Sequence, residues 1–183
     1  MSGKIKSFDG GLTPHLGEPV SVGIDQSYSG FAIAMVSGDK YQVSVYKSDK
    51  LGTDRLKDIQ QYLKSALSPY LIGDVAMEGY AYGAQMAHMA GELGGMVKVV
   101  LLDKGHYPLI VAPSMLKKYV TGKGTGVQKN QMLLNIYKKW GIEFTDDNAA
   151  DAYALAKIAS GAATTAYEKE VVSKLDSPKF RNV

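Results

Sequence analysis

The stretch VSVGIDQSYSGFAIAMVSGDKYQVSVY, residues 20–46, indicates three successive β-strands. Apolar residues alternate from Val20 to Ile24, and an unbroken apolar run follows from Phe31 to Val36. Gly38 and Asp39 form a tight turn into the third strand. Strands joined by such short turns pair antiparallel, so we predict a three-stranded meander.

Helical and strand patterns alternate beyond this stretch. Apolar residues spaced three or four apart predict a helix that begins near Thr53 and ends at Pro69. Two further strands are expected at 71–78 and 109–112, separated by a helix rich in small residues over 83–102. We therefore predict an α/β layer fold whose five-stranded mixed sheet, three antiparallel strands and then two parallel ones, is flanked by helices.

The two ends of the chain differ in composition from the middle. Residues 1–18 are polar and contain several Gly and Pro residues, which predicts a flexible leader. Residues 19–162 hold the predicted sheet and its helices and form one domain. Residues 163–183 are expected to form a helical extension followed by a loose tail.

Composition and charge exclude several classes of protein. The chain has no cysteine, so it can form neither a disulfide nor a thiolate metal site. It contains no apolar run near the ~20 residues that span a bilayer, and no secretory signal, which favours a cytoplasmic protein without a membrane partner. The net charge is only +3, but six lysines and no acidic residue lie between Leu116 and Lys139. Such a cluster is either a solvated surface or a phosphate-binding one.

Carboxylates end two of the predicted strands. Asp25 ends the first strand and Glu78 ends the fourth, at points where a buried face would continue. An isolated buried charge is costly, so such a carboxylate must be paired, hydrated or bound to metal. Each residue also has an ordinary explanation, because Asp often begins a turn and strand ends are half exposed.

A third acidic feature lies in TDDNAADAYALAKIA, residues 145–159, a predicted helix. Asp147 and Asp151 are four residues apart and so share one helix face, where like charges repel. The helix dipole explains Asp147 but not Asp151, which lies beyond the first turn. Together with Asp25 and Glu78 they would form a cluster that needs divalent cations. We expect two Mg²⁺ ions, or Mn²⁺ in their place, about 4 Å apart for in-line attack on a phosphodiester.

These motifs resemble the RuvC family of Holliday-junction resolvases. The resemblance rests on GID at 23–25, MEG at 77–79 and DNAADAYALA at 147–156, and it covers roughly residues 20–160. VAPSMLKKYVTGKGTGVQKNQML, residues 111–133, is similar to the family segment that carries two functional lysines around a Gly-x-Gly turn. The resemblance implies an RNase H-like fold, a homodimer, and paired nicks in DNA strands of like polarity. It is compatible with a bacterial or a bacteriophage source.

The resemblance also implies roles for basic and aromatic residues. Lys117 and Lys129 match the family lysines best, and Lys129 would act in catalysis. The aromatic wedge of the family would fall near Ala81, where Tyr80 or Tyr82 could stack on an unpaired base, although ordinary packing explains both equally well. The residues expected to contact DNA are Lys117, Lys118, Lys123, Lys129, Tyr80 and Tyr82.

One position departs from the family pattern. Members often carry Asp-x-x-Asp on the last helix, whereas Asn148 stands at the first of these positions here. Either Asp147 takes over the ligand role or Asn148 coordinates through its carbonyl oxygen. We predict Asp147.

The sequence therefore predicts a structure-selective endonuclease that resolves four-way DNA junctions, and other branched DNA, by paired symmetric nicks. An RNase H-like nuclease that cuts RNA or RNA–DNA hybrids would have the same metal site and is the alternative. Actin-like ATPases also begin with a strand-end Asp and a Gly-containing hairpin, but they need two such domains, so we expect no nucleotide cofactor. A DNA-binding module without activity would not need every acidic position.

Overall fold

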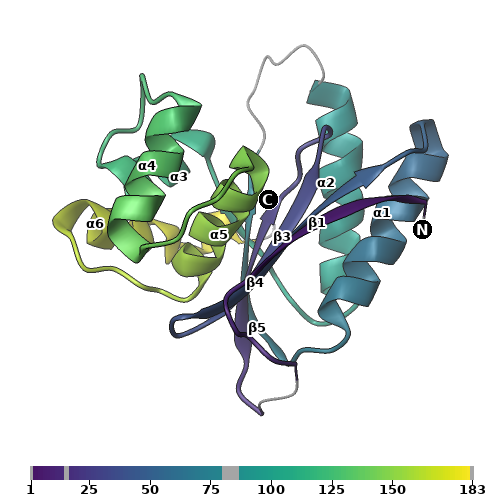
Figure 1. Cartoon of the computed structure of the whole chain (residues 1–183), viewed down its shortest axis with the longest axis horizontal. Helices are drawn as coiled ribbons and strands as arrows, with labels where there is room; N and C mark the ends of the chain where they lie inside the picture. Colours follow the sequence, from purple (N-terminus) through teal and green to yellow (C-terminus); the bar gives the residue numbers. More distant parts are fainter. Residues whose placement is uncertain (1, 15–16, 80–86, 182–183) are drawn as a thin grey trace.

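A mixed β-sheet divides the protein into two helical layers (Figure 1). The computed structural model describes residues 2–14, 17–79 and 87–181. One apolar core lies on each face of the sheet: the first beneath α1 and α2, the second beneath α5 with α3, α4 and α6 around it. Within the described ranges, no helix is both long and apolar enough to cross a membrane.

The sheet confirms the predicted meander and the two parallel strands that follow it. Strands β2, β3 and β4 pair antiparallel, β5 pairs parallel with β2, and β6 pairs parallel with β5. The strand order is β1-β4-β3-β2-β5-β6. The bounds are β1 Gly3–Asp9, β2 Val20–Asp25, β3 Phe31–Ser37, β4 Lys40–Ser48, β5 Ile72–Glu78 and β6 Leu109–Val111.

The prediction of five strands is wrong, because the sheet has a sixth strand at its edge. Strand β1 pairs with β4 from Gly3 opposite Ser48 to Asp9 opposite Gln42, so residues 3–9 are not part of a flexible leader. Most of its side chains are exposed, and backbone hydrogen bonds attach it to the sheet. A strand held in this way has no alternating apolar pattern for sequence reasoning to detect.

The helices carry the remaining chain over the two faces. Their bounds are α1 Gly52–Leu67, α2 Ala87–Leu102, α3 Pro113–Thr121, α4 Lys129–Trp140, α5 Asp147–Ala159, α6 Ala166–Leu175 and a final 3₁₀ turn η1 Pro178–Phe180. Helix α5 is buried along nearly its whole length, between the sheet and the outer helices.

Helix α5 approaches strand β2 so closely that only glycine fits between them. A Cβ atom placed on Gly23 would lie 2.0 Å from the carbonyl oxygen of Ala152 and 2.3 Å from the amide nitrogen of Ala156. The small residues of α5 make this approach possible. This contact sets the distance between α5 and β2, the strand that ends at Asp25.

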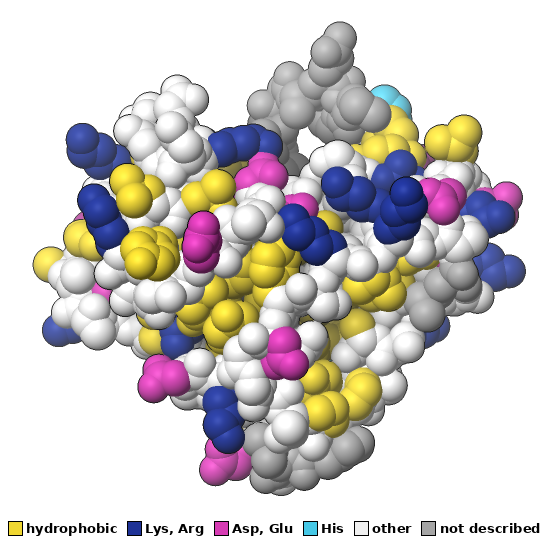
Figure 2. Space-filling model, in the orientation of Figure 1, with side chains coloured by type: hydrophobic (Ala, Val, Ile, Leu, Met, Phe, Trp, Pro, Cys, Tyr) yellow, Lys and Arg dark blue, Asp and Glu magenta, His cyan; other side chains and the backbone are white. Residues whose placement is uncertain are grey.

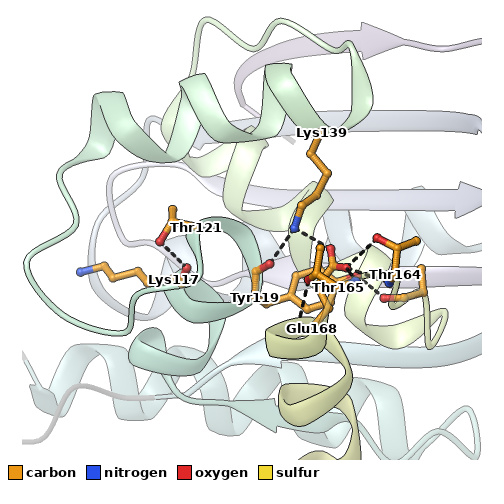
Figure 3. A network of polar contacts seen from close by, with 8 residues as sticks. Lys117, Tyr119, Thr121, Lys139, Thr164, Thr165 and Glu168 are labelled. Carbon is orange, nitrogen blue, oxygen red and sulfur yellow. Dashed lines mark hydrogen bonds and ion pairs between the residues drawn. The ribbon is translucent and has the colours of Figure 1, made fainter.

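Helix α6 is anchored by a buried carboxylate. Glu168 is 2 % exposed, and its Oε2 atom accepts hydrogen bonds from the backbone amides of Thr164 and Thr165 at 2.8 and 2.7 Å. Its Oε1 atom pairs with Lys139 at 2.5 Å (Figure 3). Burial alone would raise the pKa of Glu168, but the bonds from Lys139, Thr165 and Thr164 outweigh it and lower the pKa to about 2.

This shift predicts an acid-sensitive contribution to stability. Because the folded pKa lies below the usual 4.5, the stabilisation is present above that pH and is lost as the pH falls toward 2. Relative to Glu168→Gln, the protein should lose about 2 kcal/mol of unfolding free energy between pH 5 and pH 3. Urea denaturation at both pH values measures this, and an unchanged difference between the two proteins would contradict it.

Candidate functional site

Two carboxylates meet where strands β2 and β5 end. These neighbouring strands run parallel, in a register that places Asp25 beside Glu78. Asp25 is buried, and its Oδ1 atom accepts a hydrogen bond of 3.0 Å from the amide of Ser27, which closes the following turn. Gln26 donates from Nε2 to the carbonyl oxygen of Glu78 at 2.8 Å, so the two strand ends are tied together.

Helix α5 brings two further carboxylates to the same edge. Asp146 caps the helix by accepting hydrogen bonds from the amides of Asn148 and Ala149 at 3.1 and 3.4 Å, which explains its position. Asp147 is the first helical residue, and Asp151 lies one turn further along. The helix therefore presents both carboxylates toward the strand ends, as their spacing predicted.

The carboxylates lie close enough to influence one another's ionisation. Burial raises the pKa of Asp25 well above its usual value, and the charges of Glu78 and Asp151 raise it further. Burial raises the pKa of Glu78 to about 7, against a lowering effect of Lys117. The pKa of Asp151 is also raised to about 7, first by burial and then by Glu78 and Asp147. The cluster thus disfavours its own ionised form.

Asp147 differs from the other three because it has a cationic partner. Its carboxylate accepts a hydrogen bond from the ammonium of Lys129, which lowers the pKa of Asp147 and raises that of Lys129. Lys129 is the first residue of α4, where a capping box joins Gln128 and Gln131. Its side chain is 84 % exposed, so this ion pair is open to solvent.

A cavity of about 220 Å³ connects these groups. It lies between the end of β5 and helices α3, α4 and α5. Apolar side chains of α3 and α4 line part of it. The charged lining residues are three carboxylates and two lysines: Glu78, Asp147, Asp151, Lys117 and Lys129. Asp25 is buried and is not among the lining residues.

The predicted DNA-binding lysines separate into two groups. Lys117 and Lys129 line the cavity, whereas Lys118, the next residue to Lys117, pairs with Glu170 of α6 at 2.7 Å. Lys123 is exposed in the loop between α3 and α4. Tyr80 and Tyr82 lie outside the described residues.

Sequence reasoning did not single out Lys47, which also stands at this edge. A Cβ atom on Gly30 would lie 2.8 Å from the Nδ2 atom of Asn148 and 3.4 Å from the Cε atom of Lys47. The charge of Lys47 contributes to the lowered pKa of Asp147. The side chain of Asn148 therefore lies against Gly30, while Asp147 lines the cavity. Lys47 is a single lysine near the end of β4, and no motif in the sequence marks it as a site residue.

The carboxylates of the site are suitable ligands for a divalent cation, although their side chains do not surround a single point. Across residues 2–14, 17–79 and 87–181, no three acidic or histidine side chains are close enough to ligate a single ion. Carboxylate oxygens are nevertheless the ligands that Mg²⁺ prefers. A cation would also relieve the burial and repulsion that raise the pKa values of Asp25, Glu78 and Asp151.

Basic side chains lie at this edge of the molecule. Figure 2 shows Lys and Arg side chains gathered over the upper half of the face in view, with acidic side chains between them. Lys117 and Lys129 reach the cavity itself. A polyanion that follows the basic side chains would therefore meet the carboxylates of the cavity.

The sequence matches a known protein family, and the structure matches solved structures. The family model described as crossover junction endodeoxyribonuclease RuvC matches residues 22–159. The structure resembles that of Thermus thermophilus RuvC with 18 % identity and a TM-score of 0.63, covering 88 % of this chain and 98 % of that one. No curated protein sequence matches the chain.

Two further solved structures have the same fold. The structure of T. thermophilus RuvC in complex with a Holliday junction substrate matches with 21 % identity and a TM-score of 0.63, over 76 % of this chain and 91 % of that one. The yeast mitochondrial Holliday junction resolvase matches with 15 % identity and a TM-score of 0.55, over 86 % and 81 %. The mixed sheet flanked by helices is thus a shared architecture.

Proposed function

Because the chain belongs to the RuvC family of crossover junction endodeoxyribonucleases, we propose that it resolves four-way (Holliday) junctions, and other branched DNA, by paired symmetric nicks. The observation that carries the proposal is that Asp25, Glu78 and Asp151, which come from three separate elements, lie at one edge of the sheet. The lysines of the adjoining cavity supply the complementary charge for a phosphodiester.

The residues of the site would have different roles in binding and catalysis. Lys117 and Lys129 would bind the phosphate beside the carboxylates, and the positive end of the α4 helix dipole would add to its attraction. Contact with a phosphate would release Lys129 from Asp147 and free that carboxylate. Lys129 would then stay beside the reacting phosphate and stabilise its negative charge.

The carboxylates would hold divalent metal. We assign Asp25, Glu78, Asp147 and Asp151 as the residues that would bind two Mg²⁺ ions, with Mn²⁺ as a substitute. Bound ions would supply an activated water and would neutralise charge on the leaving oxygen. The four side chains would draw together on binding, and the loss of mutual repulsion would favour that movement.

A homodimer fits the proposed substrate. A four-way junction has to be cut in two strands, and a two-fold symmetric pair of sites matches two symmetric cuts. The alternative reaction, cleavage of RNA or an RNA–DNA hybrid, would use the same carboxylates and would need no such pairing.

Cleavage of an immobile four-way junction in Mg²⁺ tests the proposal. Strand-specific labels should reveal two nicks, placed symmetrically across the junction in strands of like polarity. A replication fork and an RNA–DNA hybrid of matched sequence are the comparison substrates. Faster cleavage of the hybrid than of either branched DNA would contradict the proposal and support the RNase H-like alternative.

Mg²⁺ is expected to stabilise the protein. A ligand that binds only the folded state, at a concentration well above its Kd, adds about 2 to 3 kcal/mol to the free energy of unfolding. For a chain of this size that corresponds to an increase in Tm of about 4 to 12 °C. The pKa of Asp151 is raised in the folded state, so its ionisation costs stability as the pH rises toward about 7. The gain from Mg²⁺ should therefore be larger at pH 8 than at pH 5.

Thermal unfolding with and without Mg²⁺ measures this gain, independently of any DNA substrate. The matched control is Asp151→Asn, which should lose most of the shift because it removes one assigned ligand. An equal increase in Tm for both proteins would contradict the assignment of Asp151.

A further inference from the structure

One buried ammonium group joins three helices behind the cavity. Lys139, near the end of α4, pairs with Glu168 of α6 and also donates a hydrogen bond of 2.8 Å to the carbonyl oxygen of Tyr119 in α3. Figure 3 shows the Nζ atom of Lys139 between these two acceptors. The side chains of Lys139 and Glu168 are 16 % and 3 % exposed, so solvent is largely excluded from the pair.

Two further contacts act close to Lys117 in α3. The hydroxyl of Thr121 donates to the carbonyl oxygen of Lys117 at 2.9 Å, and Lys118 pairs with Glu170 of α6. Lys117 itself points away from the network in Figure 3, and it lines the cavity. Neighbouring residues of α3 thus have different partners. Lys118 pairs with Glu170 and the carbonyl of Tyr119 binds Lys139, whereas Lys117 lines the cavity with the carboxylates.

The ion pair therefore sets the relative position of two helices that each carry a cavity lysine. Helix α3 carries Lys117, and α4 begins at Lys129. Glu168 lies beyond residues 22–159, the part of the chain that matches the family. We propose that Lys139 and Glu168 are positioning residues of the nuclease site, which hold α3 and α4 so that Lys117 and Lys129 face the carboxylates together. This proposal rests on the proposed nuclease function.

Stability and positioning can be separated with paired variants. A buried ion pair stabilises a fold weakly compared with a neutral pair of similar shape, whereas one unpaired buried charge is strongly destabilising. Glu168→Gln leaves Lys139 unpaired, and Lys139→Met leaves Glu168 without its cation. The double variant, Lys139→Met with Glu168→Gln, removes both charges and retains an acceptor for Thr164 and Thr165. It should recover much of the Tm lost by the single variants but still lack the bond to Tyr119.

The test is single-turnover cleavage of a four-way junction at saturating protein, at a temperature where every variant is folded. Small misplacements of catalytic groups can cost about a hundredfold in rate, and we expect the double variant to cut at least about tenfold more slowly. Lys139→Arg retains the charge and the donors, so it should recover most of the rate. Leu67→Ala, a buried site on the opposite face of the sheet, is the control for lost stability and should retain the wild-type rate. Wild-type cleavage by the double variant would overturn the proposal.

A second readout does not depend on cleavage. Because the chain has no cysteine, Ser114→Cys in α3 and Lys138→Cys in α4 give two unique sites for spin labels. The distance distribution between them should be narrow in the labelled parent and broader in the double variant. An unchanged distribution would overturn the positioning proposal even if the parent cuts junctions. A distribution that broadens in the double variant, when the labelled parent cuts no junction, would instead contradict the proposed function alone.

Discussion

Asp25→Asn is expected to bind a synthetic four-way junction as tightly as the unaltered protein and to cut it at least about a thousandfold more slowly, because loss of metal-assisted charge stabilisation costs several kcal/mol. Asn has the same size as Asp, and its Oδ1 atom can still accept the hydrogen bond from Ser27. The turn after β2 should therefore keep its shape, and only the charge is lost. Binding by gel shift without Mg²⁺ and cleavage after its addition measure the two effects.

The same variant carries a second, opposite expectation for stability. Burial and the charges of Glu78 and Asp151 disfavour an ionised Asp25, so its neutral replacement should leave the metal-free protein at least as stable. Asp103→Asn, at an exposed position after α2, is the matched control and should cut normally. Cleavage by Asp25→Asn at the wild-type rate in Mg²⁺ would make the metal assignment wrong.

Gly23→Ala is expected to lower the free energy of unfolding by about 3 kcal/mol or more, in the upper range for overpacked cores. The added methyl group would meet backbone atoms of α5 at 2.0 and 2.3 Å, and backbone cannot move aside as a flexible side chain can. Helix α5 would have to shift away from β2. Asp151 would move with it, so we expect cleavage to fall together with stability.

Gly91→Ala provides the contrast for urea denaturation. Gly91 lies within helix α2, and among the described residues a Cβ atom there would meet nothing within 4 Å beyond the backbone of its own helix. Replacing glycine by alanine inside a helix favours folding by about 0.5 to 1 kcal/mol. If both variants changed stability by a similar amount, the close contact between α5 and β2 would not be the cause of the effect at Gly23.

The acidic residues of the site could be predicted because each conflicts with its own local pattern. Asp25 and Glu78 end apolar strands, and Asp151 interrupts a run of small helical residues. Parallel pairing of the two strands then brings their ends together without further information. Local patterns thus single out these residues, and the parallel pairing of β2 with β5 places two of them side by side.

The remaining features depend on relations that no local pattern records. Lys117 and Lys118 are adjacent and chemically identical, but only the orientation of α3 decides which of them reaches the cavity. The partnership of Lys139 with Glu168 spans 29 residues and depends on where α6 packs. Strand β1 has a mostly exposed face on each side, so its place in the sheet follows from backbone pairing with β4 alone.

That added strand has a consequence for how copies of the chain can meet. The long β4 would otherwise offer its peptide groups to any passing strand, a common route to aggregation. Strand β1 covers it and carries Lys4 and Lys6, whose exposed charges discourage further extension of the sheet. At the opposite edge β6 is only three residues long, and Leu109 already bridges to Arg181. A symmetric pair would therefore associate through helical surfaces and not through a continuous intermolecular sheet.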